Sequence, residues 1–145
     1  MSDAYRAAEL AGALREKLLE QKESFIFETV FSDPVCDKLG FLQRAATAGY
    51  NVILCFIGIT DAAISEERVA MRVSQGGHDV PAQKLATRFP RTLENLRRSI
   101  RTLPHVFVFD NSDLSDPYRQ IAFFHNGEAD FLSKPLPVWM HAILK

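Results

Sequence analysis

Apolar positions change their spacing several times along the chain, and each change indicates a different element. From Ser2 to about Lys22, apolar residues recur at helical spacing between charged ones, which predicts an amphipathic helix. Ser24–Phe31 (SFIFETVF) is rich in aromatic and β-branched residues and predicts a strand. Asp33 and Pro34 then supply an N-cap acid and a first-turn proline, so we expect a second helix from there to Gly49.

The middle of the chain continues this alternation. Asn51–Ile59 (NVILCFIGI) is a continuous apolar run, which predicts a strand buried on both faces of a parallel sheet. Thr60-Asp61 is expected to cap a third helix, which should stop at a mobile Gly76-Gly77 loop. Asp79 and Pro81 restart a helix that Pro90 is expected to kink or break, because proline lacks the N–H donor and clashes with the preceding turn.

The last third contains signals for strands. His105–Asp110 (HVFVFD) predicts a strand that ends in a polar turn of the kind that lines clefts. Gln120–His125 and Glu128–Leu132 predict a hairpin about Asn126-Gly127, and a short helix is expected around Val138 to Leu144. Together these elements predict one α/β domain over residues 1–145, with a mostly parallel sheet in a three-layer fold and functional loops at the carboxyl ends of the parallel strands.

Charge is distributed unevenly along the chain. Residues 68–101 carry eight Lys/Arg and two Asp/Glu, although the whole chain has a net charge of -1. This favours a local anion-binding surface over a general nucleic-acid coat. No apolar stretch reaches membrane-spanning length, and we expect a cytoplasmic protein. Cys36 and Cys55 are not expected to form a structural disulfide, and nothing pairs Cys36 with a base that would make it a nucleophile.

Two groups of residues could perform chemistry. Glu28, followed by Thr29, places a carboxylate in an apolar strand, so either a basic partner neutralises it or it faces a cleft. Arg72, His78, Arg88 and Arg91 surround the glycine pair and Pro90, an arrangement that predicts a phosphate-clamping lid. The alternative is an exposed helix on which Arg91 and Arg98 pair with Glu94. His78 has no second histidine nearby, so we expect it to shape the lid rather than bind a metal.

Several segments in order resemble the zeta-toxin-like P-loop kinase family. They are SFIFETVFSDP, GYNVILCFIGI, RVAMRVSQGGHDVP, RFPRTLENL and FVFDNSD. The resemblance implies a P-loop NTPase fold, ATP with Mg²⁺, and phosphoryl transfer to a small molecule, such as the UDP-linked amino sugar that the best-known zeta toxins phosphorylate. It assigns Glu28 and Thr29 to substrate, Arg88 and Arg91 to the transferred phosphate, and Asn111 to the nucleotide; we group Arg72 and His78 with Asn111.

One part of the family pattern is missing. None of the seven glycines precedes a lysine, so the sequence has no Gly-x-x-Gly-x-Gly-Lys-Ser/Thr loop. We therefore expect this chain to be inactive alone, with a non-catalytic module that binds a phosphorylated ligand or a partner as the alternative function. In the family fold the missing first strand lies between the strands that correspond to residues 24–31 and 51–59. The two exposed edges predict a rearranged sheet, self-association or a separately supplied strand.

Overall fold

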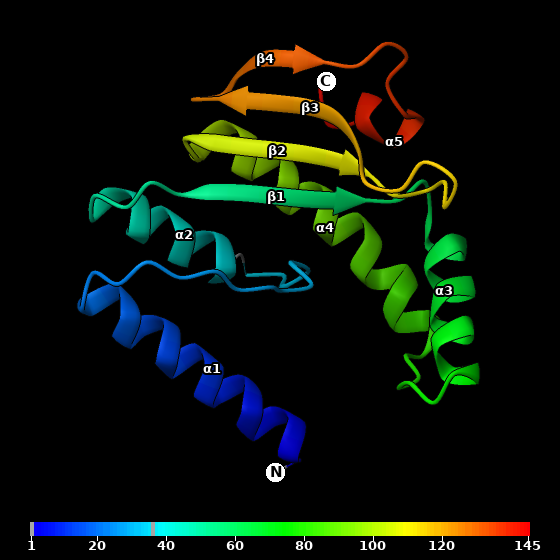
Figure 1. Ribbon diagram of the computed structural model, residues 1–145, viewed down its shortest axis with the longest axis horizontal. Helices are drawn as coiled ribbons and strands as arrows, with labels where there is room; N and C mark the ends of the chain where they lie inside the picture. The colour runs from blue at the N-terminus through cyan, green and yellow to red at the C-terminus, as the bar shows by residue number, and fades with distance from the viewer. Residues whose placement is uncertain (1, 36) are drawn as a thin grey trace.

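A computed structural model of the chain describes residues 2–35 and 37–145 (Figure 1). Helices and strands alternate along most of its length. Their order is α1 (Asp3–Glu20), α2 (Asp37–Thr47), β1 (Ile53–Gly58), α3 (Ala62–Ser74), α4 (Ala82–Thr102), β2 (His105–Asp110), β3 (Arg119–His125), β4 (Glu128–Leu132) and α5 (Val138–His141). Cys36 lies outside the described residues, and Cys55 is a free, exposed thiol.

The four strands form one mixed sheet in the order β1-β2-β3-β4. β1 and β2 are parallel, with Ile53 opposite His105 and Gly58 opposite Asp110, whereas β2, β3 and β4 are antiparallel to their neighbours. Asn126 and Gly127 join β3 to β4 with φ angles of 49° and 84°. Both values lie in the left-handed region that a tight hairpin turn requires, which confirms the predicted hairpin.

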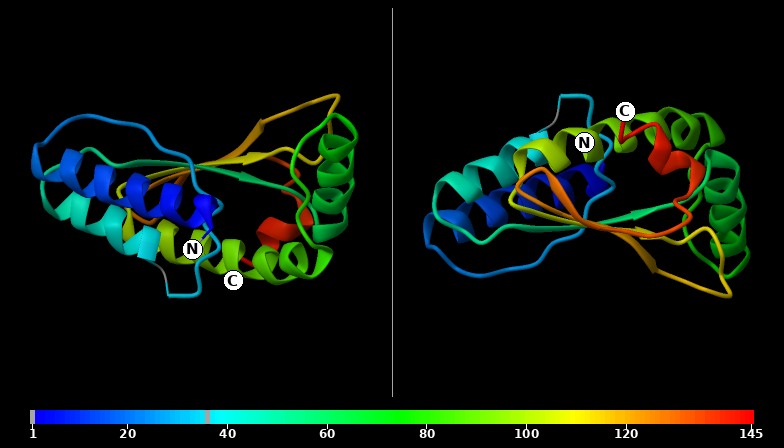
Figure 2. Two further views of the ribbon diagram at one scale, coloured as in Figure 1. Left: turned by 90° about the horizontal axis from the view of Figure 1, so that it is seen from below. Right: turned by 90° about the horizontal axis from the view of Figure 1, so that it is seen from above.

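Helices cover one face of this sheet. α2, α4 and α5 lie on the same side of it, while α3 stands at the carboxyl end of β1 (Figure 2). Burial along β1 alternates accordingly: Phe56 is 7% exposed, but Ile53 and Ile57 are 54% and 53% exposed. The prediction that this strand is buried on both faces is therefore wrong for the described residues, and the layers number two rather than three. An apolar run alone does not reveal whether a second helical layer is present.

The core lies between the sheet and its helices. α4 contributes Leu96 and Ile100, which pack against the inward side chains of β2 and β3. The side chains with less than 2% exposure are Leu96, Leu103, Ile121, Met140, Val106, Val108 and Ser99. On the opposite face, Phe107 and Phe123 stack with ring centroids 4.3 Å apart. The core therefore depends on the parallel pair and the hairpin together.

Ser24–Phe31 does not form the predicted strand. The segment has no secondary structure, and no backbone-to-backbone hydrogen bond joins residues 24–30 to another residue that the structure describes. Aromatic contacts hold it instead: the ring centroids of Phe25 and Phe27 lie 6.3 and 5.8 Å from that of Phe41. A strand needs a neighbour to pair with, and none of the described strands provides one here. The second helix also begins later than predicted, at Asp37, whose N–H is accepted by the Asp33 carboxylate.

Two predictions about the α3–α4 region have different outcomes. α3 begins after the Asp61 cap and ends at Ser74, and Gly76 (φ 89°) follows the C-cap, as the glycine pair predicted. α4, however, continues through Pro90 as one helix of 21 residues. Pro90 and Ala86 are both exposed, so water can satisfy the Ala86 carbonyl that loses its helical donor. The predicted break does not occur.

Helix α1 is attached to the domain by polar contacts and by Leu19, which packs against the core. None of its residues is buried. The Tyr50 hydroxyl lies 3.0 Å from the Leu18 carbonyl oxygen and 3.1 Å from that of Glu23. Arg44 forms a 2.6 Å ion pair with Glu16, and this hydrogen bond lowers the pKa of the Glu16 carboxyl. A lowered pKa in the folded state means that the pair stabilises the attachment above the carboxyl's ordinary pKa and is lost as the pH falls.

We expect Tyr50→Phe to loosen α1 while leaving the sheet intact. The change removes a side-chain donor that reaches the carbonyls at the end of this helix, which should cost about 1 kcal/mol. Hydrogen exchange should become faster over residues 3–20 and stay unchanged over β1 and β2. Tyr118→Phe is the matched control, because Tyr118 is 59% exposed. Unchanged exchange in α1 would show that the hydroxyl does not anchor the helix.

Candidate functional site

The carboxyl ends of β1 and β2 meet at one edge of the sheet, where their following turns are bonded together. Thr60 donates its backbone N–H and its hydroxyl to Ser112 Oγ, at 2.9 and 2.8 Å. Ser112 in turn donates its own hydroxyl to Asp110 Oδ1 at 2.6 Å. The Ser112 hydroxyl thus donates one hydrogen bond and accepts two, which is all that a hydroxyl group can form. The two turns are therefore held in a fixed relation.

Asp110 is the buried carboxylate at the centre of this edge. The residue is 8% exposed, and its Oδ1 also accepts a hydrogen bond from Trp139 Nε1 at 3.2 Å. Arg119 Nη2 lies 3.7 Å from Oδ2. Burying a carboxylate requires such compensation, and here it comes from β3, α5 and the turn after β2. Sequence reasoning missed Asp110, although its position at the end of an apolar strand was a usable signal.

The turn after β2 carries Asn111, which was predicted to bind a nucleotide. Its N–H donates to the Gly58 carbonyl at 2.8 Å, and its Oδ1 accepts from the Tyr118 N–H at 3.2 Å. Asn111 thus closes the loop from residue 111 to 118. In the same loop, hydrogen bonds from the Ser115 hydroxyl and N–H lower the pKa of Asp113. A nucleotide contact by Asn111 stays a prediction.

Helix α3 is connected to the same edge through an arginine that the sequence did not single out. Arg68 Nη2 donates to the Ser112 carbonyl at 3.1 Å. Arg72 lies one turn further along α3 and is exposed, and His78 is exposed in the connection to α4. Arg68 and Arg72 thus lie on α3 and His78 on the chain that follows it, and no described contact brings Arg72 and His78 together. Their assignment to a nucleotide stays a prediction.

Helix α4 brings the arginine segment next to the segment that carries Glu28. Arg88, Arg91 and Asn95 follow at spacings of three and four residues and so share one face of the helix. The Asn95 amide donates to the carbonyls of Phe31 and Asp33, at 2.9 and 3.2 Å. The face with both arginines is thereby fixed against the chain that immediately follows Glu28 and Thr29.

Within residues 2–35 and 37–145, the structure forms no ion pair between Glu28 and an arginine. Glu28 is exposed, and Thr29 Oγ1 accepts a 3.4 Å hydrogen bond from the Phe31 N–H. Glu94 pairs with Arg98 at 3.1 Å. The predicted exposed pairing on this helix is therefore confirmed for Arg98. Arg88 is half-buried and Arg91 is exposed.

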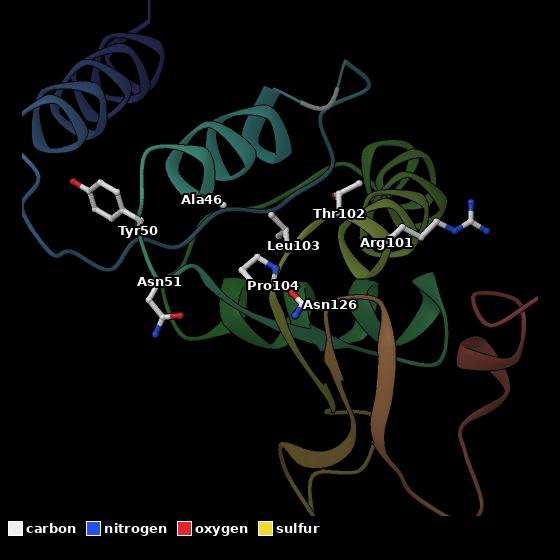
Figure 3. A pocket seen from close by; sticks show the side chains of 8 residues that line it. All are labelled: Ala46, Tyr50, Asn51, Arg101, Thr102, Leu103, Pro104 and Asn126. Carbon is white, nitrogen blue, oxygen red and sulfur yellow. The ribbon is translucent and has the colours of Figure 1, made fainter.

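A separate cavity of about 400 Å³ opens at the other end of the parallel strands (Figure 3). Asn51, Pro104 and Asn126 line it, and these residues lie before β1, before β2 and in the β3–β4 turn. Arg101 also lines it, but Figure 3 shows its guanidinium directed away from Pro104 and Asn126. None of the residues that the sequence singled out for chemistry lines this cavity. We therefore place the candidate site at the opposite edge.

The chain is similar to one family of known proteins over most of its length. A family model described as Zeta toxin matches residues 4–126, which is well over half of the chain. No match was found among curated proteins or among solved structures. Among the described residues, no helix is long and apolar enough to cross a membrane. The same residues contain no group of three or more His, Cys, Asp or Glu side chains arranged to hold a metal ion.

Proposed function

The chain belongs to the zeta toxin family, and from this premise we propose that it is a small-molecule kinase domain that is inactive as this chain alone. The proposed reaction is transfer of a phosphoryl group from ATP to a hydroxyl of a small molecule, with a nucleotide sugar as the candidate acceptor. The described residues would contribute the arginine-bearing helix and the substrate carboxylate. The alternative is a module of the same family that binds a phosphorylated ligand or a partner without turnover.

The observation that carries the proposal is the bonding of Asn95 to the carbonyls of Phe31 and Asp33. It fixes the helical face of Arg88 and Arg91 against the segment of Glu28 and Thr29, which are far apart in sequence. Guanidinium groups offer forked donors that suit phosphate oxygens, and a carboxylate can accept a hydrogen bond from a hydroxyl. The proposal is that a phosphate binds the arginine face and an acceptor hydroxyl binds Glu28 at this junction, because phosphoryl transfer needs the two groups held side by side.

Neither the N-terminus of α3 nor the glycine pair fits the triphosphate of ATP. A phosphate cradle needs free N–H groups at a glycine-rich loop or a helix N-terminus. At α3, the Asp61 carboxylate already accepts the Ile64 N–H at 3.1 Å. Gly76 and Gly77 lie at the C-terminal end of α3, and the Gly77 N–H donates to the Arg72 carbonyl at 2.7 Å. We therefore assign no step of the reaction to ATP or Mg²⁺ bound by these residues.

This lack of fit is what favours the alternative function for the isolated chain. An arginine face and a carboxylate can bind a phosphorylated ligand without a triphosphate cradle, because each arginine forms its own charge-assisted hydrogen bonds. In that case ligand binding would occur without any phosphoryl transfer. The two functions therefore share Arg88, Arg91 and Glu28 and differ in turnover.

We expect Arg88→Ala and Arg91→Ala each to weaken binding of a UDP-linked amino sugar by about tenfold or more, the loss typical of one charge-assisted contact. Isothermal titration calorimetry with this ligand, and separately with ATP, measures the change. Arg101→Ala is the matched control, since Arg101 is exposed near the far end of the same helix. Equal affinities for all four proteins would exclude the arginine face as the site.

Turnover distinguishes the two proposals. Incubation of the chain with ATP and the same sugar, followed by mass spectrometry, should show no phosphorylated product. Product formation that Arg88→Ala abolishes would contradict the proposed inactivity and support a complete kinase. Absence of binding to both ligands, in the original chain and in every variant, would contradict both functions.

A further inference from the structure

Strand β1 is paired along only one of its edges. Six residues of β1 are in register with β2. On the other edge, β1 has no strand partner among residues 2–35 and 37–145. In Figure 1, the chain that precedes α2 runs on this side of the molecule without joining the sheet. Such an edge presents a row of unpaired backbone donors and acceptors, which only another extended chain can satisfy together.

The two outer strands of the sheet differ in how they are protected against pairing. β4 (EADFL) carries Glu128 and Asp130, and charges on an edge strand discourage the addition of another strand. β1 (ILCFIG) carries no charge and exposes more than half of Ile53 and of Ile57. Another strand can therefore add to the sheet at β1, whereas the charges on β4 disfavour addition there.

The sequence of β1 is self-complementary when two copies run antiparallel about Cys55. In that register Ile53 of one copy lies opposite Ile57 of the other, and Leu54 lies opposite Phe56. Directly opposed residues point to the same face of a sheet, so Ile53, Cys55 and Ile57 of both copies would gather on the uncovered face. Each opposed pair is apolar, which is the composition that stabilises cross-strand neighbours.

The segment beside this edge offers little resistance to such pairing. Among residues 2–35 and 37–145, no backbone-to-backbone hydrogen bond involves residues 24–30. Phe25 and Phe27 hold it through ring contacts, while Ile26 is 97% exposed and Val30 is 61% exposed. Its two ends are held by hydrogen bonds from Tyr50 to the Glu23 carbonyl and from Asn95 to the Phe31 carbonyl. Between these ends, moving the segment aside costs ring contacts and takes Glu28 away from α4, and a second copy would give its exposed apolar residues a surface to cover.

We propose that two copies of this chain pair antiparallel through β1, with Cys55 at the two-fold axis, and form one continuous sheet. The interface is isologous, because the same strand serves both copies. The interface contains no residue of the arginine face on α4. It requires the segment of Glu28 to move, and sedimentation tests it separately from ligand binding.

A charge-reversal pair of variants tests this register. We expect the original chain to sediment at twice its 16.3 kDa mass. Ile53→Lys with Ile57→Lys places lysine opposite lysine twice in the dimer and should weaken it by about tenfold or more. Ile53→Lys with Ile57→Glu places lysine opposite glutamate in both pairs and should restore the dimer. Phe131→Lys, a 45% exposed position on β4, is the control and should leave the dimer unchanged.

Each outcome decides the proposal. A monomer for the original chain, or a dimer that the double-lysine variant leaves intact, overturns it. If both double variants abolish the dimer equally, the register is wrong. Both variants replace Ile53 and Ile57, so an interface in another register would lose the same two apolar side chains in each. In a Cys36→Ser background, rapid oxidative cross-linking through Cys55 supports pairing about this residue, and failure to cross-link a sedimenting dimer contradicts it. Circular dichroism confirms that each variant is folded.

Discussion

Replacing Asp110 by alanine is expected to lower the free energy of unfolding by about 3 kcal/mol, because the change leaves buried donors without an acceptor. Asp110 Oδ1 accepts from Ser112 Oγ at 2.6 Å and from Trp139 Nε1 at 3.2 Å. The Trp139 side chain is buried, so water cannot replace the carboxylate. Urea denaturation measures the loss, and the emission of Trp139, the only tryptophan in the chain, reports on α5 directly.

Asp110→Asn separates the hydrogen bonds from the charge. An asparagine oxygen can still accept from Trp139, whereas the attraction to Arg119 at 3.7 Å disappears. Because Arg119 is 40% exposed, that attraction is screened by solvent, and we expect a loss of only about 1 kcal/mol. Asp116→Ala is the control: its carboxylate is 65% exposed and should contribute less than about 0.5 kcal/mol. Equal losses for the alanine and asparagine variants would show that the charge dominates instead.

Local sequence patterns predicted some elements of this fold and not others, depending on whether the element needs a distant partner. The β3–β4 hairpin and the end of α3 depend on residues within the turn itself, and Asn126-Gly127 and Gly76-Gly77 were sufficient to predict them. The strand expected at Ser24–Phe31 depends on a neighbouring strand, about which its own residues carry no information. The same limitation applies to β1, whose apolar run predicted burial on two faces although helices cover only one.

The candidate site shows the same division between local and long-range information. Arg88, Arg91 and Glu28 were recognisable from residue type and family resemblance. The contact between α4 and the chain that follows Glu28 was not, because it depends on Asn95, whose amide bonds carbonyls more than 60 positions back along the chain. Asp110 and Trp139 are 29 positions apart, and no periodicity connects them. Contacts of this kind arise from packing and become visible only in the structure.

Gly58→Ala is expected to destabilise the protein by about 3 kcal/mol, since the position has no room for a methyl group. An ideal Cβ on Gly58 would lie 2.5 Å from Trp139 Cη2 and 2.6 Å from Cζ2. The indole cannot readily move away, because its Nε1 is bonded to Asp110 and its ring packs 6.2 Å from Phe56. Urea denaturation should show the loss, and the Trp139 emission should shift to longer wavelength.

Two comparisons identify the indole as the cause. Gly40→Ala is the matched control, because nothing lies within 4 Å of its added Cβ and alanine favours the helix, so a gain of up to about 1 kcal/mol is expected. Trp139→Phe removes the indole atoms that the methyl group added by Gly58→Ala would meet. It should therefore cost less in the Gly58→Ala background than in the original chain, which a double-mutant cycle measures as a coupling energy. Strictly additive losses would mean that β1 and α5 do not meet at Gly58, and the packing that holds Asp110 at the carboxyl edge would need another explanation.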